Sequence, residues 1–199
     1  MKKNVLTSFA LVFAAFAFSG CIGKSILEPY DPNAEYGFRL DENETSEILQ
    51  NPENNTTKIF VFRNRKAGDF ANYNLSVHYG VFNVSRPFED KDQTVFIGYS
   101  TLNFGSVTDI TNTDKPATIY AATEAPTTIK FTPKPNLIYC IESCAMFGWW
   151  IGRPDFTLLT KEKCLPFLLG DKYINSSNQA KWQKYKDIFW QKVNAKKYD

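Results

Sequence analysis

The chain has 199 residues, of which 43% are hydrophobic, 16% aromatic and 22% charged, and its formal net charge at pH 7 is +2. This composition is too apolar for a wholly disordered protein, and the length suits one ordinary domain with its own core. The balance of charges lacks the excess of Lys and Arg that nucleic-acid binding requires, so we expect no nucleic-acid partner.

The first 20 residues have the pattern of an export signal. Lys2-Lys3 form a short positive start, an apolar run follows from Val5 to Phe18, and Ser19-Gly20 precede Cys21. The run is shorter than the roughly 20 apolar residues that a permanent membrane span needs. We therefore treat residues 1–20 as a signal peptide and leave them out of the fold.

The four residues Phe18-Ser19-Gly20-Cys21 resemble the lipoprotein box of bacteria, in which the cysteine is lipidated and becomes the acylated amino terminus. The resemblance implies a lipid anchor at Cys21, with palmitate among its acyl chains, in a membrane of the cell envelope. Ile22 stands where Asp commonly retains such proteins at the inner membrane, so the resemblance favours the outer membrane, facing the periplasm. An ordinary signal peptide cleaved near Gly20 is the alternative.

Residues 21–57 hold eight acidic residues against two basic ones and contain several Pro and Asn residues. Such a segment buries too little apolar surface to offset the entropy lost on ordering. We therefore predict an acidic flexible tether, whose root-mean-square span would be roughly 35 Å.

Two asparagines of this segment, Asn43 and Asn55, have an acidic residue two positions before them and a threonine two positions after them. Both resemble the Asp/Glu-x-Asn-x-Ser/Thr acceptor sequence of the bacterial oligosaccharyltransferase, which implies two candidate glycosylation sites. An unmodified polar linker is the alternative. The shorter Asn-x-Ser/Thr triplet also occurs, without the acid, at Asn54, Asn74, Asn83 and Asn175.

From Lys58 the chain changes to short β-branched and aromatic runs separated by turn residues. Their close spacing, without helical patterns between them, predicts a mainly β domain over residues 58–170, an antiparallel β-sandwich or small barrel. Residues Ser100 to Lys115 are interpreted as a long insertion. Strands are expected at Lys58–Arg63, Asn74–Tyr79, Gln93–Tyr99, Ala117–Ala121, Thr127–Phe131, Asn136–Glu142, Asp155–Thr160 and Cys164–Leu168.

The order of these strands also resembles a family. The segments that carry the resemblance are Val61-Phe62-Arg63, Leu75 to Gly80, Phe96-Ile97-Gly98, Pro135 to Tyr139 and Phe156 to Leu159. Together they are similar to the small β-rich domain of unknown function that is common in bacterial lipoproteins. The resemblance covers roughly residues 58–168, implies a β fold, and provides no catalytic residue.

Three cysteines follow Cys21, and an oxidising periplasm favours a disulfide between two of them. A hairpin turn between Trp150 and Ile151 would place Cys140 opposite position 161, which favours the pair Cys140–Cys164 and leaves Cys144–Cys164 as the alternative. Cys140 and Cys144 on one strand would lie about 13 Å apart, beyond disulfide reach. With a single histidine, His78, we expect no zinc site and no other metal or cofactor.

The segment from Phe147 to Gly152 is apolar and aromatic where a hairpin loop is normally polar. Its large side chains, Phe147, Trp149 and Trp150, are candidates for binding an envelope protein, a glycan or a membrane, because tryptophan is enriched in binding hot spots. The alternative is that they pack on the C-terminal helix.

A basic amphipathic helix is predicted within residues 171–199, from about Ser177 to Lys196. At 100° per residue Trp182, Tyr185, Phe189 and Val193 share one apolar arc. Docking of this arc on the sheet is expected, with binding to anionic lipid or to a partner as the alternative. The opposite arc carries Gln183, Lys184, Asp187, Gln191 and Asn194.

No nucleophile, base and acid come together in a recognised catalytic pattern, so we name no catalytic residue. We therefore predict a non-enzymatic binding or structural module on a lipid anchor. The alternative is a hydrolase of envelope polymers that uses carboxylates near His78 or in the loop from Phe88 to Asp92.

Overall fold

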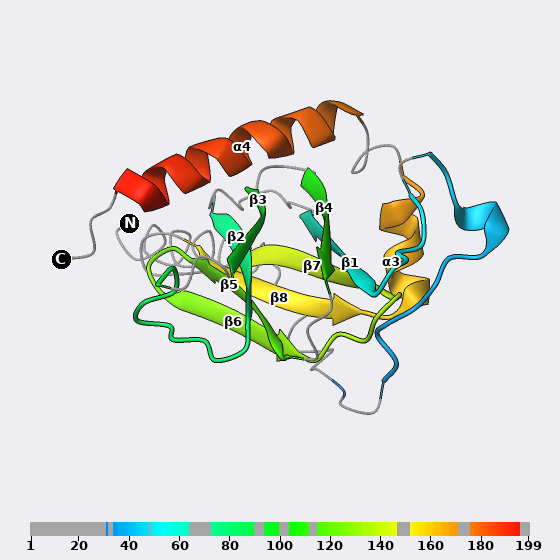
Figure 1. Cartoon of the computed structure of the whole chain (residues 1–199), viewed down its shortest axis with the longest axis horizontal. Coiled ribbons are helices and arrows are strands. Elements are labelled where there is room, and N and C mark those ends of the chain that lie inside the picture. The colour runs from blue at the N-terminus through cyan, green and yellow to red at the C-terminus, as the bar shows by residue number, and fades with distance from the viewer. Residues whose placement is uncertain are drawn as a thin grey trace, which may run out of the picture.

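The computed structural model describes residue 31 and residues 34–47, 49–63, 73–89, 94–99, 104–111, 115–146, 152–170 and 176–195 (Figure 1). Their strands form two four-stranded sheets, here called sheet A and sheet B, that pack on each other as a sandwich. The strand order is β4-β1-β7-β8 in sheet A and β3-β2-β5-β6 in sheet B. The prediction of a mainly β fold with a C-terminal helix is confirmed.

Sheet A contains one parallel pair, which the antiparallel prediction did not include. Strand β1 pairs antiparallel with β4 but parallel with β7, and β7 pairs antiparallel with β8. Parallel neighbours need a crossover connection, and here the strands of sheet B lie in the sequence between β1 and β7. Strand β4 falls inside the segment predicted as an insertion. The bounds are β1 Thr56–Arg63, β4 Phe104–Thr111, β7 Ile138–Met146 and β8 Arg153–Leu159.

Sheet B is antiparallel throughout its described pairs, and its strands were predicted close to their observed bounds. Between the sheets lies a core to which alternate residues of the strands contribute, among them Ile59, Val77, Ile119 and Ile141, none of them exposed. The two-residue period of side chains along a strand accounts for this alternation. The bounds are β2 Asn74–Tyr79, β3 Thr94–Tyr99, β5 Ala117–Ala122 and β6 Pro126–Phe131.

The outer face of sheet A is buried as well. Phe60 and Phe62 point away from sheet B and pack against α3 (Lys161–Leu168), whose Cys164 and Leu168 are buried. The prediction of a strand at Cys164–Leu168 was therefore wrong. Cys164 and Leu168 are four residues apart, about one helical turn, so a helix places both on the same face.

The segment predicted as a flexible tether packs on the domain over much of its described length. Its described residues before β1, within 34–55, are here called the N-terminal segment. Phe38, Leu40 and Leu49 are buried against the outer face of sheet A. The backbone N–H of Phe38 donates to the carbonyl of Ile138 at 3.1 Å, and that of Ile138 donates back at 2.8 Å. A short 3₁₀ helix, η1 (Glu42–Glu44), follows. The average composition of residues 21–57 did not reveal these three apolar side chains. Because they pack on sheet A, the domain begins before residue 58.

The C-terminal helix α4 (Ser176–Ala195) lies within a residue of its predicted bounds at each end. It runs across the top of the sandwich in Figure 1 and contacts β3 and β4. Phe189 and Val193 are its buried residues, and the predicted polar arc is exposed. Docking on the sheets is thus observed. None of the helices in the described part of the chain has the length and hydropathy to cross a membrane.

Candidate functional site

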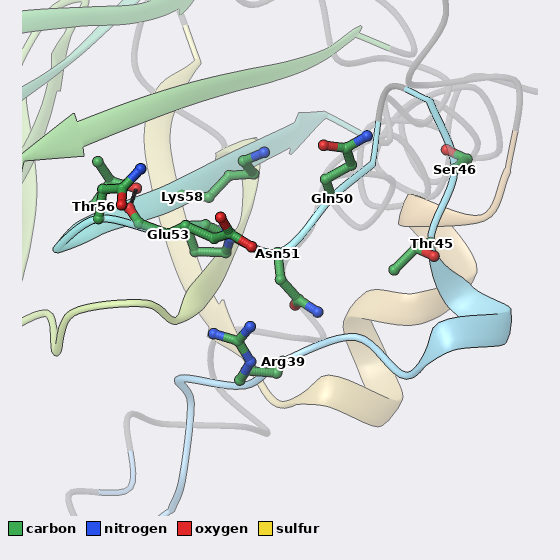
Figure 2. Close-up of a pocket in the computed structure, with 10 residues that line it drawn as sticks. Arg39, Thr45, Ser46, Gln50, Asn51, Glu53, Thr56 and Lys58 are labelled. Carbon is green, nitrogen blue, oxygen red and sulfur yellow. Dashed lines mark hydrogen bonds between the residues drawn. The ribbon is translucent and has the colours of Figure 1, made fainter.

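An open polar groove with a volume of about 770 Å³ lies between the N-terminal segment and the start of β1 (Figure 2). Its walls carry two cations, one carboxylate, three amides and three hydroxyl groups, and one proline. The lining residues are Arg39, Thr45, Ser46, Gln50, Asn51, Pro52, Glu53, Asn54, Thr56 and Lys58.

Hydrogen bonds to the backbone hold the walls of this groove in place. The Asn51 side chain accepts from the Leu40 backbone N–H at 2.7 Å and donates to the Leu40 carbonyl at 2.9 Å. Arg39 Nη1 donates to the Asn136 carbonyl at 2.8 Å, and the Asn136 side chain accepts from the Asn55 N–H at 3.2 Å. The groove is therefore preformed, which lowers the entropic cost of binding a ligand.

The chemistry of the groove is that of recognition. Arg39 and Lys58 offer N–H donors to acceptors or anions, while Gln50 and Glu53 offer an amide and a carboxylate. Glu53 is the one carboxylate among the lining residues, whereas hydrolysis of a glycoside normally takes a pair. The groove thus fits a polar ligand bound through hydrogen bonds.

His78, near which the hydrolase alternative expected its carboxylates, is buried and packs within the fold. It is buried on the outer face of sheet B, where Nε2 lies 2.8 Å from Ser76 Oγ and Nδ1 lies 3.0 Å from Thr94 Oγ1. The rings of Phe82 and Tyr120 lie 4.6 and 5.9 Å from its centroid. Burial lowers the pKa of His78 to about 4, so the imidazole is neutral at pH 7.

The carboxylates expected near His78 do not form a catalytic pair in the described structure. A cavity of about 290 Å³ beside His78 includes Glu89, whose carboxylate is exposed and pairs with Arg86 at 3.3 Å. Asp90 and Asp92 lie outside the described residues. The geometry around His78 therefore favours a structural role over general base catalysis.

A disulfide joins Cys140 on β7 to Cys164 on α3, the pair that the sequence favoured. Cys144 is buried and is not part of a disulfide. The cross-strand partners differ from those expected, because Cys140 lies opposite Leu159 rather than position 161. Cys164 reaches Cys140 because the chain turns into α3 directly after β8, and this turn brings the helix over the sheet.

Four predicted site residues lie outside the described residues: Cys21, Phe147, Trp149 and Trp150. Strand β7 ends before the aromatic segment at Met146, and β8 resumes at Arg153. Phe38 contacts the opposite end of β7, which at the usual rise lies about 26 Å from Met146. The strand ends that flank the aromatic segment therefore lie far from the entry of the N-terminal segment.

Both predicted glycosylation candidates are exposed. Asn43 is the central residue of η1, and Asn55 lies in the turn before β1 with a positive φ of 62°. The groove was not predicted, because all its lining residues except Lys58 fall in the segment interpreted as a tether. The mixture of Arg39, Asn51 and Glu53 in that segment gave no periodic signal.

No family model, curated protein or solved structure matches the chain. Across the described ranges, no three His, Cys, Asp or Glu side chains are grouped so that they would hold a metal ion.

Proposed function

We propose that this protein is a lipid-anchored protein of the bacterial cell envelope and that its membrane is the outer membrane. We propose further that its β-sandwich is a non-enzymatic binding or structural module. The anchor rests on the sequence around Cys21 and on the apolar run before it. The observation that supports the location best is the buried disulfide Cys140–Cys164, because disulfides persist in oxidising compartments and are rare in the cytosol.

The packed N-terminal segment brings the domain closer to the lipid than a long tether would. Only 12 residues lie between Cys21 and Ala34, which is described and belongs to the N-terminal segment. A chain of that length reaches at most about 45 Å, whatever its conformation. The polar groove lies beside this segment, which suits a ligand or partner near the membrane surface.

The binding role rests on the groove around Arg39 and Glu53 and on the aromatic segment at Trp149 and Trp150. The groove has a preformed polar lining with a single carboxylate, and His78 is neutral and engaged on both ring nitrogens. These features support binding of an envelope protein or glycan over hydrolysis of an envelope polymer.

The anchor is tested with Cys21→Ala. We expect the variant to leave the detergent-soluble membrane fraction and to lose the mass of the acyl chains, measured on the intact protein. A variant that stays with membranes and is processed as the wild type would refute the lipid anchor. Processing near Gly20 without added lipid in the wild type would favour the ordinary signal peptide.

The binding role is tested by crosslinked pull-down from cells that carry the wild type, Arg39→Ala with Glu53→Ala, or Trp149→Ala with Trp150→Ala. We expect one pair of substitutions to remove partners that the other retains, because the strand ends that flank the aromatic segment lie far from the entry of the N-terminal segment. Unfolding curves control for folding. Identical partners for all three proteins, together with hydrolysis of envelope polymers by the purified chain, would favour the enzyme instead.

A further inference from the structure

Five Asn-x-Ser/Thr triplets lie in the described part of the chain, and the structure separates them. An enzyme that glycosylates such a triplet must reach both the asparagine amide and the hydroxyl two residues later. All five asparagines are exposed, but the hydroxyl residues differ widely in burial. The triplets begin at Asn43, Asn54, Asn55, Asn74 and Asn83.

The triplet at Asn55 is closed by strand β1. Its hydroxyl residue, Thr57, has no exposed surface, and Thr57 Oγ1 donates to the Lys134 carbonyl at 2.9 Å. Thr57 also pairs with Ile110 across the sheet, and the Asn55 N–H is bonded to the Asn136 side chain. Access to this triplet therefore requires opening of sheet A, whose cost approaches that of global unfolding.

The triplets at Asn54 and Asn74 are also restricted. Ser76, two residues after Asn74, is buried in β2 and bonded to His78. Thr56, two residues after Asn54, is half-buried at the start of β1, and its hydroxyl donates to the Glu53 carbonyl at 2.6 Å. Neither triplet carries an acidic residue two positions before the asparagine.

The triplet at Asn43 is more accessible than the other acidic triplet, at Asn55, although the Thr45 hydroxyl donates to the Glu42 carbonyl at 2.8 Å. Asn43 and Thr45 are exposed, and η1 contains no buried residue. The turn is held by polar contacts: the Asp41 N–H donates to Glu44 Oε2 at 2.7 Å, and Lys161 Nζ lies 2.9 Å from the same oxygen, where the Glu44 side chain is 14% exposed. Opening of η1 exposes no buried residue of η1, so it costs less than opening of sheet A.

We propose that Asn43 is the site of an N-linked oligosaccharide and that Asn55 is not modified in the folded chain. This proposal rests on the proposed envelope location, where the donor, a polyprenyl-diphosphate-linked oligosaccharide, is presented to exported proteins. The Asn43 amide nitrogen forms a bond to the anomeric carbon of the sugar, and the bond from that carbon to the diphosphate oxygen breaks. The amide nitrogen loses one proton to the transferase, and the polyprenyl diphosphate departs with the bonding electrons.

The test uses the purified mature chain with its disulfide intact, a bacterial oligosaccharyltransferase that reads the acidic acceptor sequence, and its lipid-linked donor. Free peptides that span residues 39–47 and 51–59 are included as acceptors in parallel reactions. Occupancy of each site is measured by glycopeptide mass spectrometry. Because the reaction is carried out in vitro, its result does not depend on export or on lipidation of Cys21.

We expect both peptides to be glycosylated. We expect the folded chain to accept a glycan at Asn43 with at least about tenfold higher occupancy than at Asn55, because access to Asn55 requires opening of sheet A. Asn43→Gln should abolish the modification and Asn55→Gln should leave it unchanged. Equal occupancy of the two sites, or an unmodified Asn43 beside a modified peptide 39–47, would overturn the proposal.

The loop at Asn83 provides a matched gain-of-function control. Asn83 and Ser85 are both exposed, and Val81, two positions before Asn83, is fully exposed. Val81→Asp completes the acidic acceptor sequence at a position where no packing is disturbed. We expect this variant to gain a glycan at Asn83. A modified Asn83 together with an unmodified Asn43 in the same molecule would show that exposure and the acid do not suffice at Asn43, and would refute the assignment.

Discussion

The outer faces of the two sheets are covered in different ways. On sheet A, aromatic and aliphatic side chains of β1 and β7 pack against α3 and the N-terminal segment, and a disulfide locks α3 in place. On sheet B, His78 is hydrogen-bonded to Ser76 and Thr94 and packs against the rings of Phe82 and Phe88. Phe88 in turn contacts Phe189 of α4.

The two covers therefore differ in the conditions that weaken them. The cover of sheet A depends on apolar burial and a covalent bond, neither of which titrates. The cover around His78 depends on a buried imidazole that must stay neutral. We therefore expect reduction to weaken the first and acid to weaken the second.

The largest expected effect is on the sheet A side. Replacing the disulfide with Cys140→Ala and Cys164→Ala releases a loop of 24 residues. The chain-entropy relation then gives a loss of about 3 to 4 kcal/mol in the free energy of unfolding, measured by urea denaturation. Reductant should lower the unfolding midpoint of the wild type and leave that of the double variant unchanged.

Cys144→Ala is the matched control, since Cys144 is buried on the same strand but is not in a disulfide. We expect it to lose only about 1 kcal/mol through the small cavity it leaves. A larger loss for Cys144→Ala than for the double variant would contradict the view that the disulfide locks the cover of sheet A.

On the sheet B side, acid should destabilise the fold through His78. Burial disfavours the imidazolium and lowers the pKa of His78 in the folded state to about 4, from the 6.5 that is usual for histidine. The contribution of this group to the free energy of unfolding is thus fully present above pH 6.5. It falls as the pH drops toward 4. The difference corresponds to roughly 2 to 3 kcal/mol.

The carboxylates of the chain titrate in the same range, so the measurement is the difference between the wild type and His78→Gln. We expect the wild type to lose roughly 2 to 3 kcal/mol more than the variant between pH 7 and pH 4. Parallel pH dependences for the two proteins would show that the histidine is not held neutral by the fold.

The strands of both sheets were largely predictable, because short runs of β-branched and aromatic residues, such as those of β1, β2 and β5, are separated by turn residues. The pairing was not, since the parallel contact between β1 and β7 joins segments that are distant in sequence and leaves no local signal. Helix α3 was missed because eight residues with Pro166 inside give a weak helical pattern.

The cover of sheet A was harder to predict than its strands. Phe38, Leu40 and Leu49 are too few to mark a packed segment by composition, and each is buried only because sheet A presents a second apolar face. The groove that this segment forms was missed for the same reason. The disulfide pair was favoured from the expected hairpin, but its geometry was not predicted, because Cys164 lies on α3 rather than on a strand.

A smaller effect is expected where α4 joins the cover of sheet B. Phe189 is buried and its ring lies 5.2 Å from that of Phe88. Phe189→Ala should lower the free energy of unfolding by about 2 kcal/mol, less than a central core phenylalanine, because its neighbours Phe88 and Trp190 are only partly buried. Faster amide hydrogen exchange in α4 than in β1 should accompany the loss. Lys184→Ala, on the exposed side, is the control and should change neither quantity.

The smallest effect is expected at Gly37, where the N-terminal segment meets β7. A Cβ atom at this position would lie 2.7 Å from Leu137 Cδ1 and 2.7 Å from the Tyr139 hydroxyl. Gly37→Ala must therefore displace the segment or the tyrosine, whose hydroxyl accepts the Lys134 N–H at 2.9 Å. We expect a loss of about 1 kcal/mol and faster proteolysis between residues 34 and 49, because overpacking weakens the docked segment before the sheets. Glu35→Ala, an exposed neighbour, should leave proteolysis unchanged, and equal cleavage of both variants would show that the segment is not held by close packing at Gly37.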